Sequence, residues 1–127
     1  MRKIMIVDDD AEIANLVEAT LTRDDYEIIK AHNGEEAVSR AKADMPELIL
    51  MDVVMPKKDG YAACREIRSD PATEHIRIVM LTSMGGQEQV RKGLQAGANG
   101  HMVKPFSPVA LIDKVSEMLP DEGSGDA

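Results

Sequence analysis

The run Leu48-Ile49-Leu50-Met51 is apolar throughout and ends in the carboxylate of Asp52. Such a run is typical of a strand that is buried on both faces of a parallel sheet. Three other apolar runs end in polar groups in the same way: Ile4–Val7 before Asp8-Asp9-Asp10, Ile78–Leu81 before Thr82-Ser83, and Met102-Val103 before Lys104. If these runs are parallel strands, their ends gather carboxylates, a hydroxyl and one ammonium group into a single pocket.

Amphipathic segments alternate with the apolar runs along the chain. Apolar residues at helical spacing predict helices over about 11–23, 34–43, 60–69 and 87–95, and a last helix that begins at Ser107-Pro108. Asn33 predicts the start of the second helix and Gly97 the end of the fourth. Tyr26–Lys30 is a fifth strand, and its polar character places it near an edge; the run Met102-Val103 belongs to a short strand over Gly100–Val103.

Five strand–helix units predict an α/β fold with helices on both faces of a parallel sheet. Because crossover connections are right-handed, the best fit is a doubly wound, flavodoxin-like sheet in the order 2-1-3-4-5. That order puts the three most apolar strands in the centre. We expect one domain over residues 1–119, and an acidic flexible tail or the start of a linker over residues 120–127.

The composition excludes several classes of protein. No apolar run approaches the ~20 residues that a membrane span needs, so we expect a cytoplasmic protein. The net charge of −8 argues against direct nucleic-acid binding by this domain. The single cysteine, Cys64, rules out an internal disulfide and a multi-cysteine zinc site, and its helical context predicts a small buried core residue.

The polar residues at the strand ends suit phosphoryl transfer, which needs positioning, a divalent cation and charge neutralisation. Asp8, Asp9 and Asp52 offer oxygen ligands for Mg²⁺. Asp52 is the candidate nucleophile, because it follows the central strand. Lys104 offers a point charge and Thr82 a hydroxyl for the same phosphoryl group.

Each of these residues also has a simpler interpretation. Asp8-Asp9-Asp10 are good helix caps, Lys104 alone indicates a solvated lysine, and Thr82 and Asp59-Gly60 alone indicate turns. The phosphoryl-transfer hypothesis is favoured because the four sets of residues all follow strands in the required order.

Over residues 2 to about 119 the chain resembles a response-regulator receiver domain of two-component signalling, of the chemotaxis-regulator type. The matching motifs are Val7-Asp8-Asp9-Asp10, Asp52 with Met55-Pro56 and Asp59-Gly60, Leu81-Thr82-Ser83, and Val103-Lys104-Pro105-Phe106. The resemblance implies that a histidine kinase or histidine phosphotransfer protein donates a phosphoryl group to Asp52. It also implies that the backbone carbonyl of Val54 joins the aspartates around Mg²⁺, and that the peptide bond between Lys104 and Pro105 is cis.

The resemblance further implies a switch. Thr82 would move toward the phosphoryl group, His101 would turn inward where the family more often has Tyr or Phe, and a downstream protein would bind the face of the fourth helix, fifth strand and fifth helix. Val54 and Met84 would flank the path of the attacking water, and their apolar side chains predict slow loss of the phosphoryl group. Such a protein catalyses only its own phosphorylation and dephosphorylation.

Three alternatives remain at this point. A haloacid-dehalogenase-type hydrolase would need a second Asp two residues after the nucleophile, where this chain has Val54. A flavin-binding protein would need a phosphate loop without three aspartates, and more aromatic residues than 2% of the chain. A docking-only receiver would not need the intact Asp, Thr and Lys set. Both a stand-alone regulator and a piece of a longer chain fit the sequence.

Overall fold

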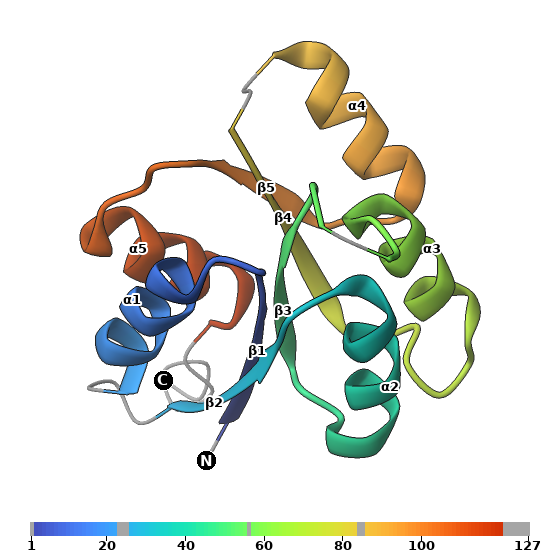
Figure 1. Ribbon diagram of the computed structural model, residues 1–127, viewed down its shortest axis with the longest axis horizontal. Coiled ribbons are helices and arrows are strands. Elements are labelled where there is room, and N and C mark those ends of the chain that lie inside the picture. The colour runs from blue at the N-terminus through green and yellow to red at the C-terminus, as the bar shows by residue number, and fades with distance from the viewer. Residues whose placement is uncertain (1, 23–25, 56, 84–85, 121–127) are drawn as a thin grey trace.

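Five parallel strands form one sheet in the order β2-β1-β3-β4-β5, as predicted. The computed structural model describes residues 2–22, 26–55, 57–83 and 86–120 (Figure 1). The strands are β1 (Arg2–Val7), β2 (Tyr26–Ala31), β3 (Leu48–Asp52), β4 (Arg77–Thr82) and β5 (Gly100–Val103). The more polar β2 lies at one edge and β5 at the other, so that β1, β3 and β4 are central.

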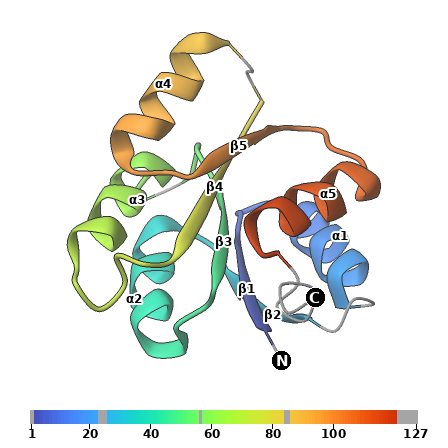
Figure 2. The same ribbon diagram turned by 180° about the vertical axis from the view of Figure 1, so that it is seen from behind.

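The helices cover both faces of the sheet (Figures 1 and 2). They are α1 (Ala11–Thr22), α2 (Gly34–Asp44), α3 (Gly60–Ser69), α4 (Gln87–Ala96) and α5 (Pro108–Met118). Alternate residues of each strand point to opposite faces. Ile4 therefore packs in the core under α1 and α5, whereas its neighbour Met5 packs in the core under α2, α3 and α4.

The helices α2, α3 and α5 begin with side-chain caps of one kind. Asn33, Asp59 and Ser107 each accept a hydrogen bond from the backbone N–H three residues further on, at 2.8, 2.8 and 3.1 Å. Asp59-Gly60 is therefore not a separate turn: Asp59 caps α3 and Gly60 is its first residue. Gly97 ends α4 in the left-handed conformation with φ 101°, as its position predicted.

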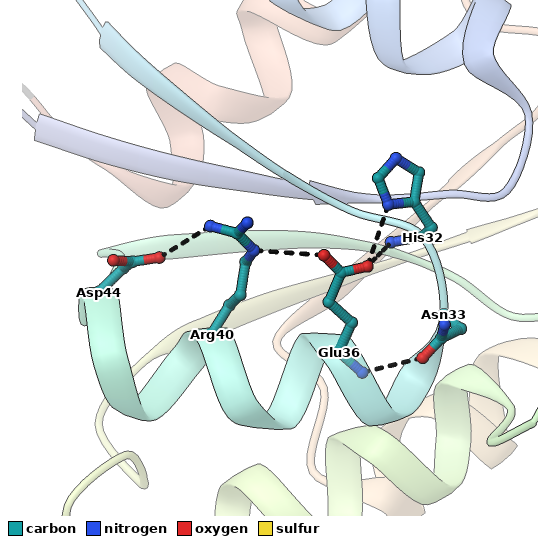
Figure 3. A network of polar contacts seen from close by, with 5 residues as sticks. All are labelled: His32, Asn33, Glu36, Arg40 and Asp44. Atoms are coloured by element: carbon teal, nitrogen blue, oxygen red, sulfur yellow. Dashed lines mark hydrogen bonds and ion pairs between the residues drawn. The ribbon is translucent and has the colours of Figure 1, made fainter.

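A chain of exposed polar contacts runs along α2 from its start (Figure 3). The Glu36 carboxylate accepts a hydrogen bond from the backbone N–H of His32 at 2.8 Å and contacts His32 Nδ1 at 3.0 Å. Arg40 then links Glu36 to Asp44. Exposed ion pairs contribute little free energy, so only the contacts of Glu36 with His32 bear on how α2 begins.

The observed strands are longer than the apolar runs. Asp52 is the last residue of β3, because its backbone still pairs with Leu81 of β4, and Thr82 likewise pairs with Val103. Cys64 is fully buried, as predicted. Among the described residues, no helix is both long enough and apolar enough to cross a membrane. The segment 121–127, for which a tail or linker is expected, lies outside the described residues.

Gly60 lies directly against the backbone of the central strand. A Cβ atom at this position would stand 2.2 Å from the carbonyl oxygen of Asp52. We therefore expect Gly60→Ala to push β3 and α3 apart and to lower the free energy of unfolding by about 1–3 kcal/mol, measured by urea denaturation. Gly86→Ala is the control, because no heavy atom lies within 4 Å of that Cβ position. Equal losses in the two variants would contradict the close contact.

Candidate functional site

The candidate site lies at the carboxyl end of the sheet, around Asp52. Asp52 ends the central strand β3, between the neighbouring ends of β1 and β4. Only 6% of its surface is exposed. Buried carboxylates need partners, and the residues that follow the neighbouring strands supply them.

The three aspartates after β1 have three different positions. Asp8 is 1% exposed, and its Oδ1 accepts a hydrogen bond from the backbone N–H of Asp10 at 2.9 Å. Asp10 turns outward, and its own Oδ1 accepts from the backbone N–H of Glu12 at the start of α1, also at 2.9 Å. Asp9 is exposed at the rim. The capping interpretation is thus correct for Asp10, while Asp8 belongs to the site.

Lys104 connects the carboxylates of two strands. Its Nζ lies 3.0 Å from Asp8 Oδ2 and 3.3 Å from Asp52 Oδ1. The backbone holds this side chain in place, because Lys104 N donates to Thr82 O at 2.7 Å. The following peptide bond, to Pro105, is cis, as the family resemblance implied.

Thr82 lies between the strands that carry Asp52 and Lys104. It is the last residue of β4, directly after Leu81, which pairs with Asp52. Its side chain is buried. The strand register therefore brings a hydroxyl to the same end of the sheet as the carboxylates.

The electrostatics of the site are dominated by crowded negative charge. Burial, together with the charge of Asp8, raises the pKa of Asp52 to about 6, although Lys104 acts in the opposite direction. Burial by itself would lower the pKa of Lys104, but its hydrogen bond to Asp8 and the charge of Asp52 outweigh burial and raise it. One ammonium group cannot neutralise three carboxylates, so the site favours a further cation.

The aspartates have the arrangement that such a cation requires. One carboxylate oxygen each from Asp8, Asp9 and Asp52 lies within 4.8 Å of the other two. Oxygen ligands of this kind, completed by water, suit a hard divalent cation such as Mg²⁺. The donor set therefore fits a metal centre that adjoins the buried nucleophile candidate.

Comparison with known proteins identifies the family. The family model of the response regulator receiver domain matches residues 4–116. The chain belongs to this family. It is a receiver domain, the phosphorylation-activated switch of two-component signalling, and its sheet order and acidic cluster fit that assignment.

Similar receiver domains occur in proteins with different outputs. A probable transcriptional regulator, ycf27, of Porphyra purpurea is 42% identical over 92% of this chain. The match covers 47% of that protein, so the chain spans about half the length of this relative. The chemotaxis response regulator CheY4 of Vibrio cholerae is 33% identical, with a TM-score of 0.89 over 94% of this chain and 99% of that one.

A third relative has a metal ion in its site. The receiver domain of a sensor histidine kinase from Pseudomonas aeruginosa is 31% identical, with a TM-score of 0.86 over 94% of this chain and 98% of that one. Its structure has a magnesium ion coordinated in the active site cleft.

The receiver domain brings together most of the residues predicted from the sequence. Asp8, Asp9, Asp52 and Lys104 meet at the site, and Thr82 adjoins them. Other predicted residues are further out: the side chain of Val54 is 77% exposed, and His101 is half-buried on the edge strand β5. Met84 lies outside the described residues.

Two features of the site were not predicted from the sequence. The first is the direct contact of Lys104 with Asp8, for which neither residue carries a signal of its own. The second is the close approach of Gly60 to the Asp52 carbonyl. The Asp59-Gly60 pair predicted a turn, but it gave no sign of this contact.

The raised pKa of Asp52 predicts a pH-dependent effect of Asp52→Asn. The folded state binds the Asp52 proton more tightly than the unfolded state does, so protonation of Asp52 stabilises the fold. This contribution to the free energy of unfolding is fully present below about pH 3.8 and is lost as the pH rises through 6. At pH 7 without divalent cations, Asp52→Asn should raise stability by about 1 kcal/mol, or roughly 3–5 °C in Tm. Near pH 4 the gain should be smaller.

Scanning calorimetry at the two pH values measures this difference. Asp10→Asn is the control, because Asp10 is exposed and caps α1. A gain that is the same at both pH values would show that burial of the Asp52 charge does not cause it.

Proposed function

We propose that Asp52 is the phosphoacceptor of this receiver domain and that it takes its phosphoryl group from the phosphohistidine of a histidine kinase or histidine phosphotransfer protein. The observation that carries the proposal is the buried Asp52 carboxylate, 3.3 Å from Lys104 Nζ and within 4.8 Å of two further aspartates. In the transfer, an Asp52 oxygen attacks phosphorus, and the bond from phosphorus to the imidazole nitrogen breaks.

The neighbouring residues have distinct roles in this proposal. Asp8, Asp9 and Asp52, with the backbone carbonyl of Val54, would hold Mg²⁺, which supplies positive charge to the phosphoryl oxygens when it is bound. Lys104 exchanges its contact with the Asp52 carboxylate for one with a phosphoryl oxygen. The Thr82 hydroxyl donates a hydrogen bond to another oxygen of the same group.

Phosphorylation then acts as a switch. Thr82 moves toward the phosphoryl group and His101 turns inward from β5, which changes the face made by α4, β5 and α5. A downstream protein recognises that face. The protein works in the cytoplasm, without direct nucleic-acid or membrane contact by this domain, and turns over no separate substrate.

The receiver domain ends near residue 119 in this proposal, and residues 120–127 form a tail or linker. The support comes from Arg2 in β1, which donates to the carbonyl oxygens of Leu119 at 3.0 Å and Pro120 at 3.1 Å, so the chain is held against the domain as far as the first residue of that tail. These contacts tie the chain that follows α5 to the first strand of the domain.

Treatment with acetyl phosphate and Mg²⁺, followed by intact-protein mass spectrometry, tests the phosphoacceptor. We expect one acid-stable, base-labile phosphoryl group on the wild-type chain, and none on Asp52→Asn or after chelation of Mg²⁺. Asp10→Asn is the matched control and should be labelled as the wild type is. Labelling of Asp52→Asn at the wild-type rate would refute the assignment.

The apolar side chain of Val54 predicts slow loss of the phosphoryl group from Asp52. Valine cannot orient the attacking water by a hydrogen bond. Val54→Asn should therefore speed dephosphorylation by roughly two- to tenfold, the value of one hydrogen bond in the transition state. The decay of the phosphorylated fraction over time measures the rate. Val109→Asn, a change at an exposed valine of α5, is the control, and an equal acceleration in both variants would contradict a role specific to residue 54.

A further inference from the structure

The helix α4 is attached to the domain very differently at its two ends. At its C-terminal end, Arg68 of α3 donates from Nε to the carbonyl oxygen of Gly97 at 3.0 Å, and from Nη2 to Asn99 Oδ1 at 3.0 Å. Asn99 Oδ1 also accepts from the backbone N–H of Ile78 in β4 at 2.8 Å. This end is thus bound to both α3 and β4.

Close packing also fixes the C-terminal half of α4. Gly93 and Ala96 are buried. A Cβ at Gly93 would already lie 3.4 Å from Met80 Cγ, and one at Gly97 only 2.9 Å from Arg68 Cγ. This half of the helix therefore lies in close contact with Met80 of β4 and Arg68 of α3.

The first turn of α4 has a weaker attachment. In the part of the chain that the structure describes, one side-chain hydrogen bond joins this turn to α3: the Tyr61 hydroxyl donates to Gln89 Oε1 at 2.8 Å. Tyr61 packs against the hydrophobic core under α2, α3 and α4. Burial, with the charges of Asp59 and Glu88, raises the pKa of Tyr61, so its hydroxyl remains a donor at neutral pH.

We propose that the hydrogen bond from Tyr61 to Gln89 is a latch that holds the N-terminal end of α4 in its unphosphorylated position, while the end bound by Arg68 serves as the pivot. Lys104 is paired directly with the Asp52 carboxylate, which is the resting arrangement in the proposed function. The latch is closed in this state. Gln89 lies in the first turn of α4, so displacement of this turn on phosphorylation opens the latch.

The proposal rests on the proposed function and adds the element that sets the resting position of the switch. A contact made only in the resting state stabilises that state relative to the active state. The population of the active state falls accordingly. One hydrogen bond corresponds to roughly a two- to tenfold change in that population. Removing the latch therefore makes the active state easier to reach, and ligands of that state bind more tightly.

Binding of beryllofluoride with Mg²⁺, a stable analogue of the phosphoryl group, tests the latch by titration calorimetry. Tyr61→Phe removes only the hydroxyl, and Gln89→Ala removes the acceptor. Each should lower the Kd for beryllofluoride by roughly two- to tenfold. The double variant should give no further gain, because both changes break the same bond. Merely structural damage would weaken the binding instead, so the direction of the change separates the two explanations.

Two controls match the chemistry of these changes. Tyr26→Phe removes the hydroxyl of the second tyrosine, on the opposite edge strand β2, and Gln95→Ala truncates an exposed glutamine of α4. Neither should alter the Kd. In Tyr61→Phe, hydrogen exchange should quicken at the amide of Val90, in the first helical turn, but not at that of Ala98, which bonds to Gly93 O beside the pivot.

The outcomes separate the latch from the function on which it rests. If the wild type does not bind beryllofluoride in the presence of Mg²⁺, the phosphoacceptor assignment fails and the latch fails with it. If the wild type binds but Tyr61→Phe and Gln89→Ala bind equally well or more weakly, the latch alone is refuted.

Discussion

The functional site depends on the charge balance between the carboxylates of Asp8 and Asp52 and the single ammonium group of Lys104. Both carboxylates are buried, and Lys104 Nζ contacts each of them. Burial makes ionisation of Asp52 costly, as its raised pKa reflects. The site therefore holds more negative charge than Lys104 neutralises, and this excess favours the binding of a cation.

The sheet topology follows from how strongly the sequence alternates between apolar runs and amphipathic segments. The runs around Ile49 and Val79 are apolar because both faces of a central strand are covered, so a short run was enough to identify each strand. Sequence patterns were less accurate at the strand ends. Asp52 and Thr82 are polar, yet their backbones continue the ladder, because hydrogen bonding between strands does not depend on side-chain polarity.

The residues of the site could be predicted from the sequence, because the carboxyl ends of parallel strands lie at one edge of the sheet. Their individual contacts were not. Asp8, Asp9 and Asp10 are chemically identical in sequence, but one is buried in the site, one lies at the rim and one caps α1. The contact from Lys104 to Asp8 spans 96 residues, and only the folded chain brings the two together. Packing geometry, which has no local signature, decides such contacts.

The two ends of the sheet differ in what stabilises them. At the amino ends of the strands, guanidinium groups satisfy backbone carbonyls: Arg2 binds Leu119 O and Arg68 binds Ile76 O and Gly97 O. These bonds are made to groups whose charge does not change. At the carboxyl ends, stability depends on ionised side chains whose charge changes with cation binding and phosphorylation. If the proposed switch begins at Asp52, its rearrangement meets an opposite end that Arg68 fixes, and we expect α4 to respond by moving its first turn.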